Sequence, residues 1–151
     1  MGQFLGTHVN RLDRKGRVSV PAPFRAALAR FETTELILRP HHKSACIEAR
    51  PEPEFRRLAA RLDTLDSFSD DHDALAFALF ASAHSAIPDA EGRIVLPEAL
   101  IAHAGLGETV AFVGLGRLFQ IWTPEEAERM TRSAVQAARE RGLTLPGGGT
   151  A

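Results

Sequence analysis

Residues 13–21 read Asp-Arg-Lys-Gly-Arg-Val-Ser-Val-Pro, and residues 89–97 read Asp-Ala-Glu-Gly-Arg-Ile-Val-Leu-Pro. Both stretches follow the pattern D-x-x-G-R-(V/I)-x-(V/L)-P, with Asp, Gly, Arg and Pro at the same positions. Chance similarity between two apolar segments does not usually reproduce all four of these residues. The sequence therefore contains an internal repeat with an offset of 76 residues.

The same order of predicted elements surrounds each copy of the motif. Pro21 suits the opening of a helix, which we predict over residues 22–31, and residues 98–104 form its counterpart. Two strand-like runs follow each helix, and they cover residues 35–39, 45–48, 109–113 and 118–122. Each copy thus reads strand, turn, strand, short helix, strand, strand. A unit of about 45 residues rarely buries enough apolar surface alone, so we expect the two copies to share one core.

Longer helices are predicted between and after the repeats. Residues 53–66 carry apolar side chains at helical spacing, and Ser69 is suited to cap a helix over residues 70–83. A capping box at Thr123-Pro124-Glu125-Glu126 predicts a helix that runs to about Arg141. The predicted organisation is a first repeat (7–53), connecting helices (54–81), a second repeat (82–125), a C-terminal helix (126–143) and a disordered tail (144–151).

The formal net charge of the chain is -1, which by itself gives no support for nucleic-acid binding. The distribution of charge is more informative. Residues 9–30 contain six basic side chains and a single acidic one, whereas residues 85–106 contain one arginine against three acidic side chains. The first repeat is locally basic and the second locally acidic, and the sum over the whole chain conceals this difference.

Glycine in each motif marks a chain reversal, because Gly16 and Gly92 tolerate a positive φ. An aspartate and an arginine, four residues apart, flank each turn and can form a charge-assisted hydrogen bond; they are Asp13 and Arg17, and Asp89 and Arg93. One interpretation is that both pairs only brace the turns. This interpretation is favoured for the second turn, where Ala90 and Glu91 offer little to a phosphate.

The first turn carries a cluster of cations, which are Arg11, Arg14, Lys15 and Arg17. Such a turn suits contacts with phosphates, and arginine suits guanine edges in the major groove of DNA. Because successive side chains of a strand point to opposite faces, the four cannot all share one surface, and Arg17 could be divided between Asp13 and DNA. A solvated charged face is the alternative interpretation.

The sequence also resembles a known family. Residues 6–21, Gly-Thr-His-Val-Asn-Arg-Leu-Asp-Arg-Lys-Gly-Arg-Val-Ser-Val-Pro, closely resemble the start of the MraZ family of bacterial transcriptional regulators. Residues 84–97 and 119–122 match its pattern too, and the resemblance extends over residues 4–141. It implies an α+β fold of two tandem AbrB-like swapped-hairpin units. Each unit carries a D-x-x-x-R motif, formed here by Asp13 and Arg17 and by Asp89 and Arg93.

The resemblance further implies a function. Family members assemble into ring-like homo-oligomers, bind double-stranded DNA at short direct repeats upstream of the division and cell-wall gene cluster that includes their own gene, and act mainly as repressors in the cytoplasm and nucleoid. The DNA-binding residues carry over onto Arg14, Lys15 and Arg17. Arg11 is an additional candidate at a position where many relatives have an uncharged residue. A ring suits a near-neutral chain, because linked weak contacts gain about 10²–10⁴ in avidity.

No catalytic, cofactor or metal site is predicted. A zinc site would need further ligands beside His41, His42 and Cys46. No nucleophile elbow accompanies Ser82, His84 and Ser85. A hairpin turn is the interpretation that suits residues 114–116. The sequence favours a cytoplasmic protein without a membrane partner. It has one cysteine, no secretory signal at residues 1–6 and no apolar run of about 20 residues. The alternatives are a structural ring that acts through protein partners and, more remotely, a small-molecule enzyme.

Overall fold

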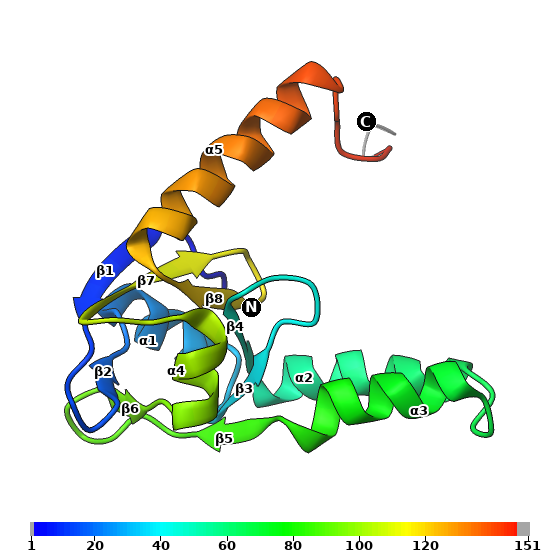
Figure 1. Ribbon diagram of the computed structural model, residues 1–151, viewed down its shortest axis with the longest axis horizontal. Helices are drawn as coiled ribbons and strands as arrows, with labels where there is room; N and C mark the ends of the chain where they lie inside the picture. The colour runs from blue at the N-terminus through cyan, green and yellow to red at the C-terminus, as the bar shows by residue number, and fades with distance from the viewer. Residues whose placement is uncertain (1, 148–151) are drawn as a thin grey trace.

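The computed structural model describes residues 2–147 and shows each repeat in the predicted order of elements (Figure 1). The first repeat consists of β1 (Thr7–Arg11), β2 (Arg17–Ser19), α1 (Ala22–Arg30), β3 (Leu36–Pro40) and β4 (Ile47–Pro51). The second consists of β5 (His84–Ala86), β6 (Arg93–Val95), α4 (Glu98–Ala104), β7 (Thr109–Gly114) and β8 (Phe119–Trp122). Strand β4 begins two residues later than predicted, because the Cys46 N–H bonds the Ser44 carbonyl at 2.9 Å, which closes a tight turn just before the strand.

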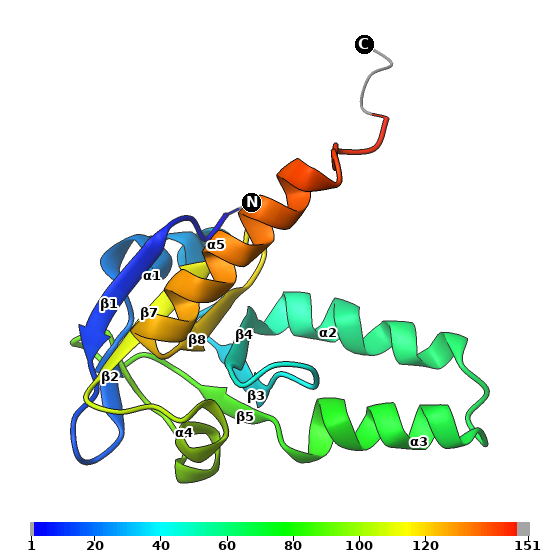
Figure 2. The same ribbon diagram turned by 45° about the horizontal axis from the view of Figure 1, so that its top comes forward.

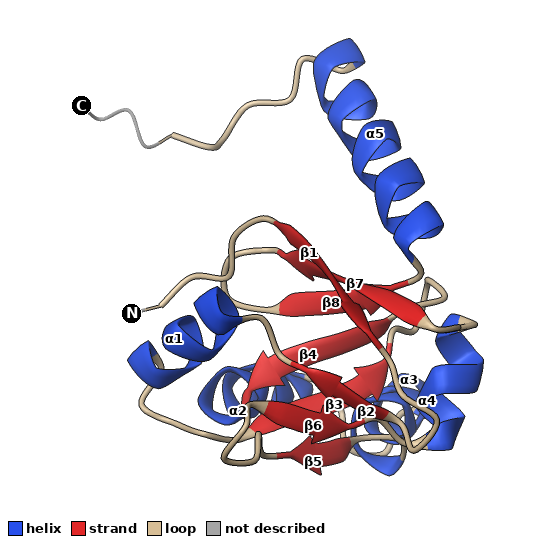
Figure 3. Ribbon diagram, turned by 90° about the vertical axis from the view of Figure 1, so that its left-hand side faces the viewer, coloured by secondary structure: helices blue, strands red, loops and turns tan. Residues whose placement is uncertain are grey.

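The first two strands of each repeat pair with the other repeat. Strand β1 lies antiparallel to β7, β5 lies antiparallel to β3, and β2 pairs with β6. The result is a six-stranded sheet in the order β1-β7-β8-β4-β3-β5 and a separate β2–β6 ribbon (Figure 3). The sheet order is symmetric about the β8–β4 pair. This exchange of strands confirms the predicted α+β fold of two swapped-hairpin units.

The two repeats share one hydrophobic core, as predicted. Phe4 lies before β1, Phe24 lies on α1, Phe112 lies on β7 and Phe119 lies on β8. All four side chains are almost fully buried. Their rings meet edge-on or tilted, with centroids 5.3 Å apart for Phe4 and Phe24 and 5.1 Å apart for Phe24 and Phe119. Each unit therefore completes the core of the other, which fixes the position of the turns and of the ribbon.

The connecting helices form a projecting arm (Figure 1). Helix α2 (Glu52–Ala60) gives way to a 3₁₀ turn (Arg61–Thr64), so the predicted single helix over 53–66 is wrong at its end; the Leu65 N–H bonds the Leu62 carbonyl at 3.1 Å, which tightens this last turn. The Ser69 hydroxyl caps α3 (Asp70–Ala76), accepting from the His72 N–H at 3.1 Å as predicted. The helix predicted over 70–83 continues only as a π-helical segment (Phe77–Ala81).

Helix α5 (Pro124–Glu140) leaves the sheet at an angle (Figure 2). The Thr123 hydroxyl accepts from the Glu126 N–H at 3.2 Å, which confirms the predicted start of this helix. Ala127 is its one buried residue, and the later turns are largely exposed. The predicted tail lies only partly in the described chain: residues 144–147 have no helix or strand, and 148–151 lie outside the described residues. Among residues 2–147, no helix has the length and apolar character needed to cross a bilayer.

Candidate nucleic-acid interface

The first turn is fixed by the carboxylate of Asp13. Its Oδ1 atom accepts from the backbone N–H groups of Lys15 at 2.9 Å and Arg17 at 2.8 Å, and its Oδ2 atom accepts from Arg17 Nε at 2.7 Å. The Gly16 N–H bonds the Asp13 carbonyl at 3.1 Å, and Gly16 has a φ of 80°. Bonds to the ionised carboxylate, above all from the Arg17 N–H, hold the pKa of Asp13 below its usual value.

The second turn repeats this backbone geometry. Asp89 Oδ1 accepts from the N–H groups of Glu91 at 2.8 Å and Arg93 at 3.0 Å, and Gly92 has the same φ of 80°. The pKa of Asp89 is likewise lowered, first by the Arg93 N–H and then by the Glu91 N–H. The predicted bracing role of both Asp–Arg motifs therefore matches the geometry of each turn.

The side-chain charges of the two turns differ. Arg17 Nε lies 2.7 Å from Asp13, and the two terminal amino groups of Arg17 form no hydrogen bond within residues 2–147. Arg93 is shared between two carboxylates, because its Nε lies 3.4 Å from Asp89 and its Nη2 lies 3.0 Å from Glu91. The first turn thus presents uncompensated positive charge, whereas the second turn pairs its arginine internally.

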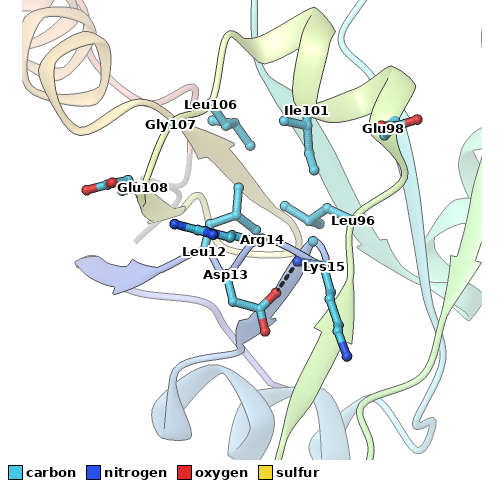
Figure 4. A pocket seen from close by; sticks show the side chains of 11 residues that line it. Leu12, Asp13, Arg14, Lys15, Leu96, Glu98, Ile101, Leu106, Gly107 and Glu108 are labelled. Carbon is cyan, nitrogen blue, oxygen red and sulfur yellow. Dashed lines mark hydrogen bonds between the residues drawn. The ribbon is translucent and has the colours of Figure 1, made fainter.

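Arg14 and Lys15 lie exposed at the tip of the first turn, and neither side chain forms an ion pair in the described part of the chain. Figure 4 shows the two side chains pointing away from one another, at the edge of a hollow of about 550 Å³. The turn forms one wall of this hollow. The other wall consists of Leu96, which lies between β6 and α4, of Glu98 and Ile101 on α4, and of Leu106 and Glu108 in the loop after α4. The open setting leaves both cations accessible to a large polyanion.

Arg11 lies apart from the other cations. The adjacent Asn10 side chain points to the ribbon and donates from Nδ2 to the Ser19 carbonyl at 2.6 Å. Because side chains alternate along a strand, Arg11 points to the opposite face of β1, together with Thr7 and Val9, which line a groove beside α5. The structure therefore brings Arg14, Lys15 and Arg17 together around one turn and directs Arg11 elsewhere.

Sequence reasoning missed that the helix of each repeat lies against the turn of the other. A Cβ atom placed on Gly92 would lie 2.7 Å from the Arg25 guanidinium of α1, and one on Gly16 would lie 3.6 Å from Ile101 of α4. Arg25 and Ile101 each come four residues after the proline of their motif. The repeat alignment pairs these positions, but only the exchange of strands reveals that Arg25 supplies a cation to the acidic second turn.

The remaining candidate residues lie apart from the turns. His41 and His42 stack with centroids 5.0 Å apart, and Cys46 is buried, which raises its pKa to about 12. The described residues contain no group of three His, Cys, Asp or Glu side chains placed to hold a metal ion. Ser85 donates to Glu35 at 2.6 Å. The hairpin turn predicted at residues 114–116 extends to residue 118, because the Leu115 N–H bonds the Leu118 carbonyl at 2.9 Å.

Comparisons with known proteins agree with the repeat. A family model described as "MraZ protein, putative antitoxin-like" matches residues 3–78 and again residues 79–143. A protein named "Transcriptional regulator MraZ" from Gluconacetobacter diazotrophicus is 54% identical over 152 residues, which cover 99% of this chain and 95% of the relative.

Two further relatives carry the same name. The one from Gluconobacter oxydans is 52% identical over 148 residues, which cover 96% of this chain and 88% of the relative. The one from Rickettsia canadensis is 40% identical over 145 residues, which cover 96% and 97% respectively. Together with the strand exchange and the two Asp–Arg turns, these matches show that the chain belongs to the MraZ family.

Proposed function

We propose that this chain is a sequence-specific DNA-binding transcriptional regulator, and that Arg14, Lys15 and Arg17 make its principal DNA contacts. One observation carries the proposal: three cations surround one turn, and the pairing of Arg17 with Asp13 is the only ion pair that any of them forms within residues 2–147. The relatives' name, transcriptional regulator, supports the same class of function.

The geometry suggests a division of roles among the three cations. Arg14 and Lys15 are exposed and form no ion pair with any residue that the structure describes. Contacts of such cations with phosphates fix the register of a protein on the duplex without reading sequence. Arg17 is oriented through its Nε by Asp13, so its two terminal amino groups are free for the O6 and N7 atoms of a guanine. Arg11 points to another face and would add at most a flanking phosphate contact.

The targets are short direct repeats upstream of the division and cell-wall gene cluster that includes the chain's own gene, and the protein acts there mainly as a repressor in the nucleoid. This part of the proposal extends the family resemblance to the present chain. One turn makes only about three phosphate contacts, which gives weak and salt-sensitive binding. Several turns on one assembly, matched to several repeats, would convert later contacts into intramolecular ones.

A ring-like homo-oligomer would provide those several turns. Two elements project from the sheet with uncovered apolar side chains: the arm carries Phe68, which is 93% exposed, and Phe77, which is 71% exposed, and α5 carries Met130 and Val135. Large exposed apolar side chains concentrated on projecting elements favour contacts with other proteins. Covering these surfaces by other copies of the chain would leave the cationic turn, at the opposite edge, available to DNA.

The test is fluorescence anisotropy with labelled DNA from upstream of the chain's own gene, against a scrambled duplex of equal composition. We expect preferential binding of the repeat-containing DNA, and loss of that preference in Arg17→Ala and Lys15→Ala. Lys43→Ala is the matched control, because Lys43 is an exposed cation in the loop between β3 and β4, outside the turn, the arm and α5. Equal binding of both duplexes, or unchanged affinity of folded turn variants, would contradict the proposal.

The oligomeric part has its own measurement. Native mass spectrometry of the full chain, with and without repeat-containing DNA, should give a closed assembly of several subunits. A monomer in both conditions would contradict the ring.

A further inference from the structure

The β2–β6 ribbon presents one face to solvent and the other to the core. Val18 and Ile94 lie opposite one another and are buried. The flanking cross-strand pairs, Arg17 with Val95 and Ser19 with Arg93, therefore point outward. The outer face of the ribbon consists of these four side chains, two from each repeat, and none of them is acidic.

Both arginines of this face are oriented by their own turns. The carboxylate of Asp13 holds Arg17 at 2.7 Å, and that of Asp89 holds Arg93 at 3.4 Å. The two arginines are diagonal neighbours across the ribbon, so their backbones lie about 7–8 Å apart. This separation corresponds to about two base-pair steps of 3.4 Å. Figure 1 places the ribbon at the edge of the molecule farthest from the arm.

A two-stranded antiparallel ribbon has dimensions that fit the major groove of DNA. We propose that the outer face of the β2–β6 ribbon enters the major groove, and that the second repeat reads bases through Arg93 and Val95. The inference rests on the proposed DNA-binding function and adds the second repeat to the recognition site. Arg93 would donate to a guanine, and Val95 would contact the methyl group of a thymine, which are the partners suited to these side chains.

The pairing of Arg93 with Glu91 does not oppose this role strongly. The Glu91 side chain is largely exposed, and an exposed ion pair contributes little free energy, so Arg93 can exchange Glu91 for a base. The exchange makes Arg93 a weaker contact than Arg17, whose terminal amino groups have no partner among residues 2–147 to release. The two halves of the recognition site are therefore unequal, which suits a direct repeat better than a palindrome.

The first experiment places a negative charge on the ribbon face. Val95→Glu should weaken binding of repeat-containing DNA by about a hundredfold, because a carboxylate in the groove faces phosphates and base acceptors. Ile87→Glu is the matched control: it also replaces a β-branched apolar side chain by glutamate in the same repeat, and Ile87 is 60% exposed against 59% for Val95. Losses of similar size in both variants would overturn the placement of the ribbon in the groove.

The second experiment identifies the bases. Binding to every single-base variant of one repeat should show that Arg93→Ala loses about tenfold in discrimination at one guanine and little elsewhere. Replacing individual thymines by deoxyuridine should weaken the wild type severalfold at one position, and Val95→Ser should remove that sensitivity. A uniform loss across all sequences in Arg93→Ala, or no position with the thymine effect, would overturn the base-reading role.

The placement of the ribbon in the groove and the proposed DNA-binding function can fail independently. If wild type binds repeats and Lys15→Ala weakens binding, but Val95→Glu behaves like Ile87→Glu, the ribbon inference fails and the proposed function stands. If wild type does not prefer repeat-containing DNA, the proposed function itself fails. Circular dichroism and the melting temperature of each variant establish that it is folded. The Val95 variants test the ribbon inference even if Arg93→Ala unfolds, because Val95 is exposed and its side chain cannot form a hydrogen bond.

Discussion

The two turns of this molecule share a backbone and differ in charge. Each has an aspartate that accepts two backbone N–H groups at 2.8–3.0 Å and a glycine with a φ of 80°. Between them, the first turn carries Arg14 and Lys15 and the second carries Ala90 and Glu91. The geometry that the two turns share therefore has a structural role in each repeat, whereas the two residues at each tip determine what the turn can bind.

The comparison also separates two roles of the arginine in the motif. Bracing of the turn requires only the Nε contact with the aspartate, which both arginines make. Binding requires free terminal amino groups. Those of Arg17 have no partner in the described part of the chain, whereas Arg93 Nη2 lies 3.0 Å from Glu91. One residue type at equivalent positions can therefore be structural in one repeat and functional in the other.

Charge reversal at the tips of the two turns should have the largest effect on DNA binding. Lys15→Glu removes one phosphate contact and adds repulsion, so we expect the affinity for repeat-containing DNA to fall by about a hundredfold. The opposite change, Glu91→Lys, should strengthen non-specific binding severalfold and steepen its salt dependence. Anisotropy titrations at several salt concentrations measure both effects. Lys43→Glu, an exposed change in the β3–β4 loop, is the control and should have little effect.

Replacing the glycine of each turn should lower the free energy of unfolding by different amounts. A Cβ on Gly16 would lie 2.8 Å from the Leu96 carbonyl oxygen, which is backbone and cannot move aside, whereas on Gly92 it would meet the flexible Arg25 side chain. Both changes strain a left-handed residue by about 1–2 kcal/mol. We therefore expect Gly16→Ala to lower the free energy of unfolding by about 3 kcal/mol and Gly92→Ala by about 1–2 kcal/mol. Equal losses in urea denaturation would contradict this difference.

A conservative change at the motif arginines tests recognition. Lysine cannot make the Nε contact with Asp13 and also donate two bonds to a guanine, so Arg17→Lys should lose about tenfold in preference for the repeat sequence. Binding to scrambled DNA should change little, because the charge is kept. Arg93→Lys should lose less, since Arg93 already shares its charge with two carboxylates. The ratio of the two dissociation constants measures the effect, and a larger loss in Arg93→Lys would contradict it.

Low pH should reduce the stability of both turns to a similar, small extent. The pKa values of Asp13 and Asp89 are lowered on folding from the usual 3.8. Their contribution to stability is therefore fully present above that value and is lost as the pH falls through the lowered folded values. We expect the double variant Asp13→Asn/Asp89→Asn to show a flatter loss of stability below about pH 4 than the wild type. Parallel pH profiles in thermal melts would contradict this.

Local features of the fold could be predicted because they depend on neighbouring residues. The positions of Gly16 and Gly92 marked both turns, Pro21 and Pro97 marked the starts of α1 and α4, and Thr123 marked the start of α5. The helix ends were less predictable. The α2 helix tightens into a 3₁₀ turn at Arg61, although the apolar spacing of the sequence continues without a break.

The site was only partly predictable, because its assembly is non-local. The cluster of Arg14, Lys15 and Arg17 is visible in the sequence, since all three lie around one turn. The pairing of Arg17 with Val95 is not visible, because these two residues are 78 positions apart and meet only through the exchange of strands between repeats. The contact of Arg25 with the second turn depends on the same exchange.

The most direct test of the account is a reciprocal exchange of the two turn tips in the full chain, Arg14→Ala, Lys15→Glu, Ala90→Arg and Glu91→Lys together. This variant keeps the net charge of -1 and leaves the aspartate, glycine and arginine of each turn unchanged, so we expect both turns to keep their backbone geometry. The measurement is its affinity for repeat-containing DNA relative to scrambled DNA. We predict that the preference disappears while the variant stays folded and oligomeric. A preference equal to that of the wild type would show that the cations of the first turn do not carry DNA recognition.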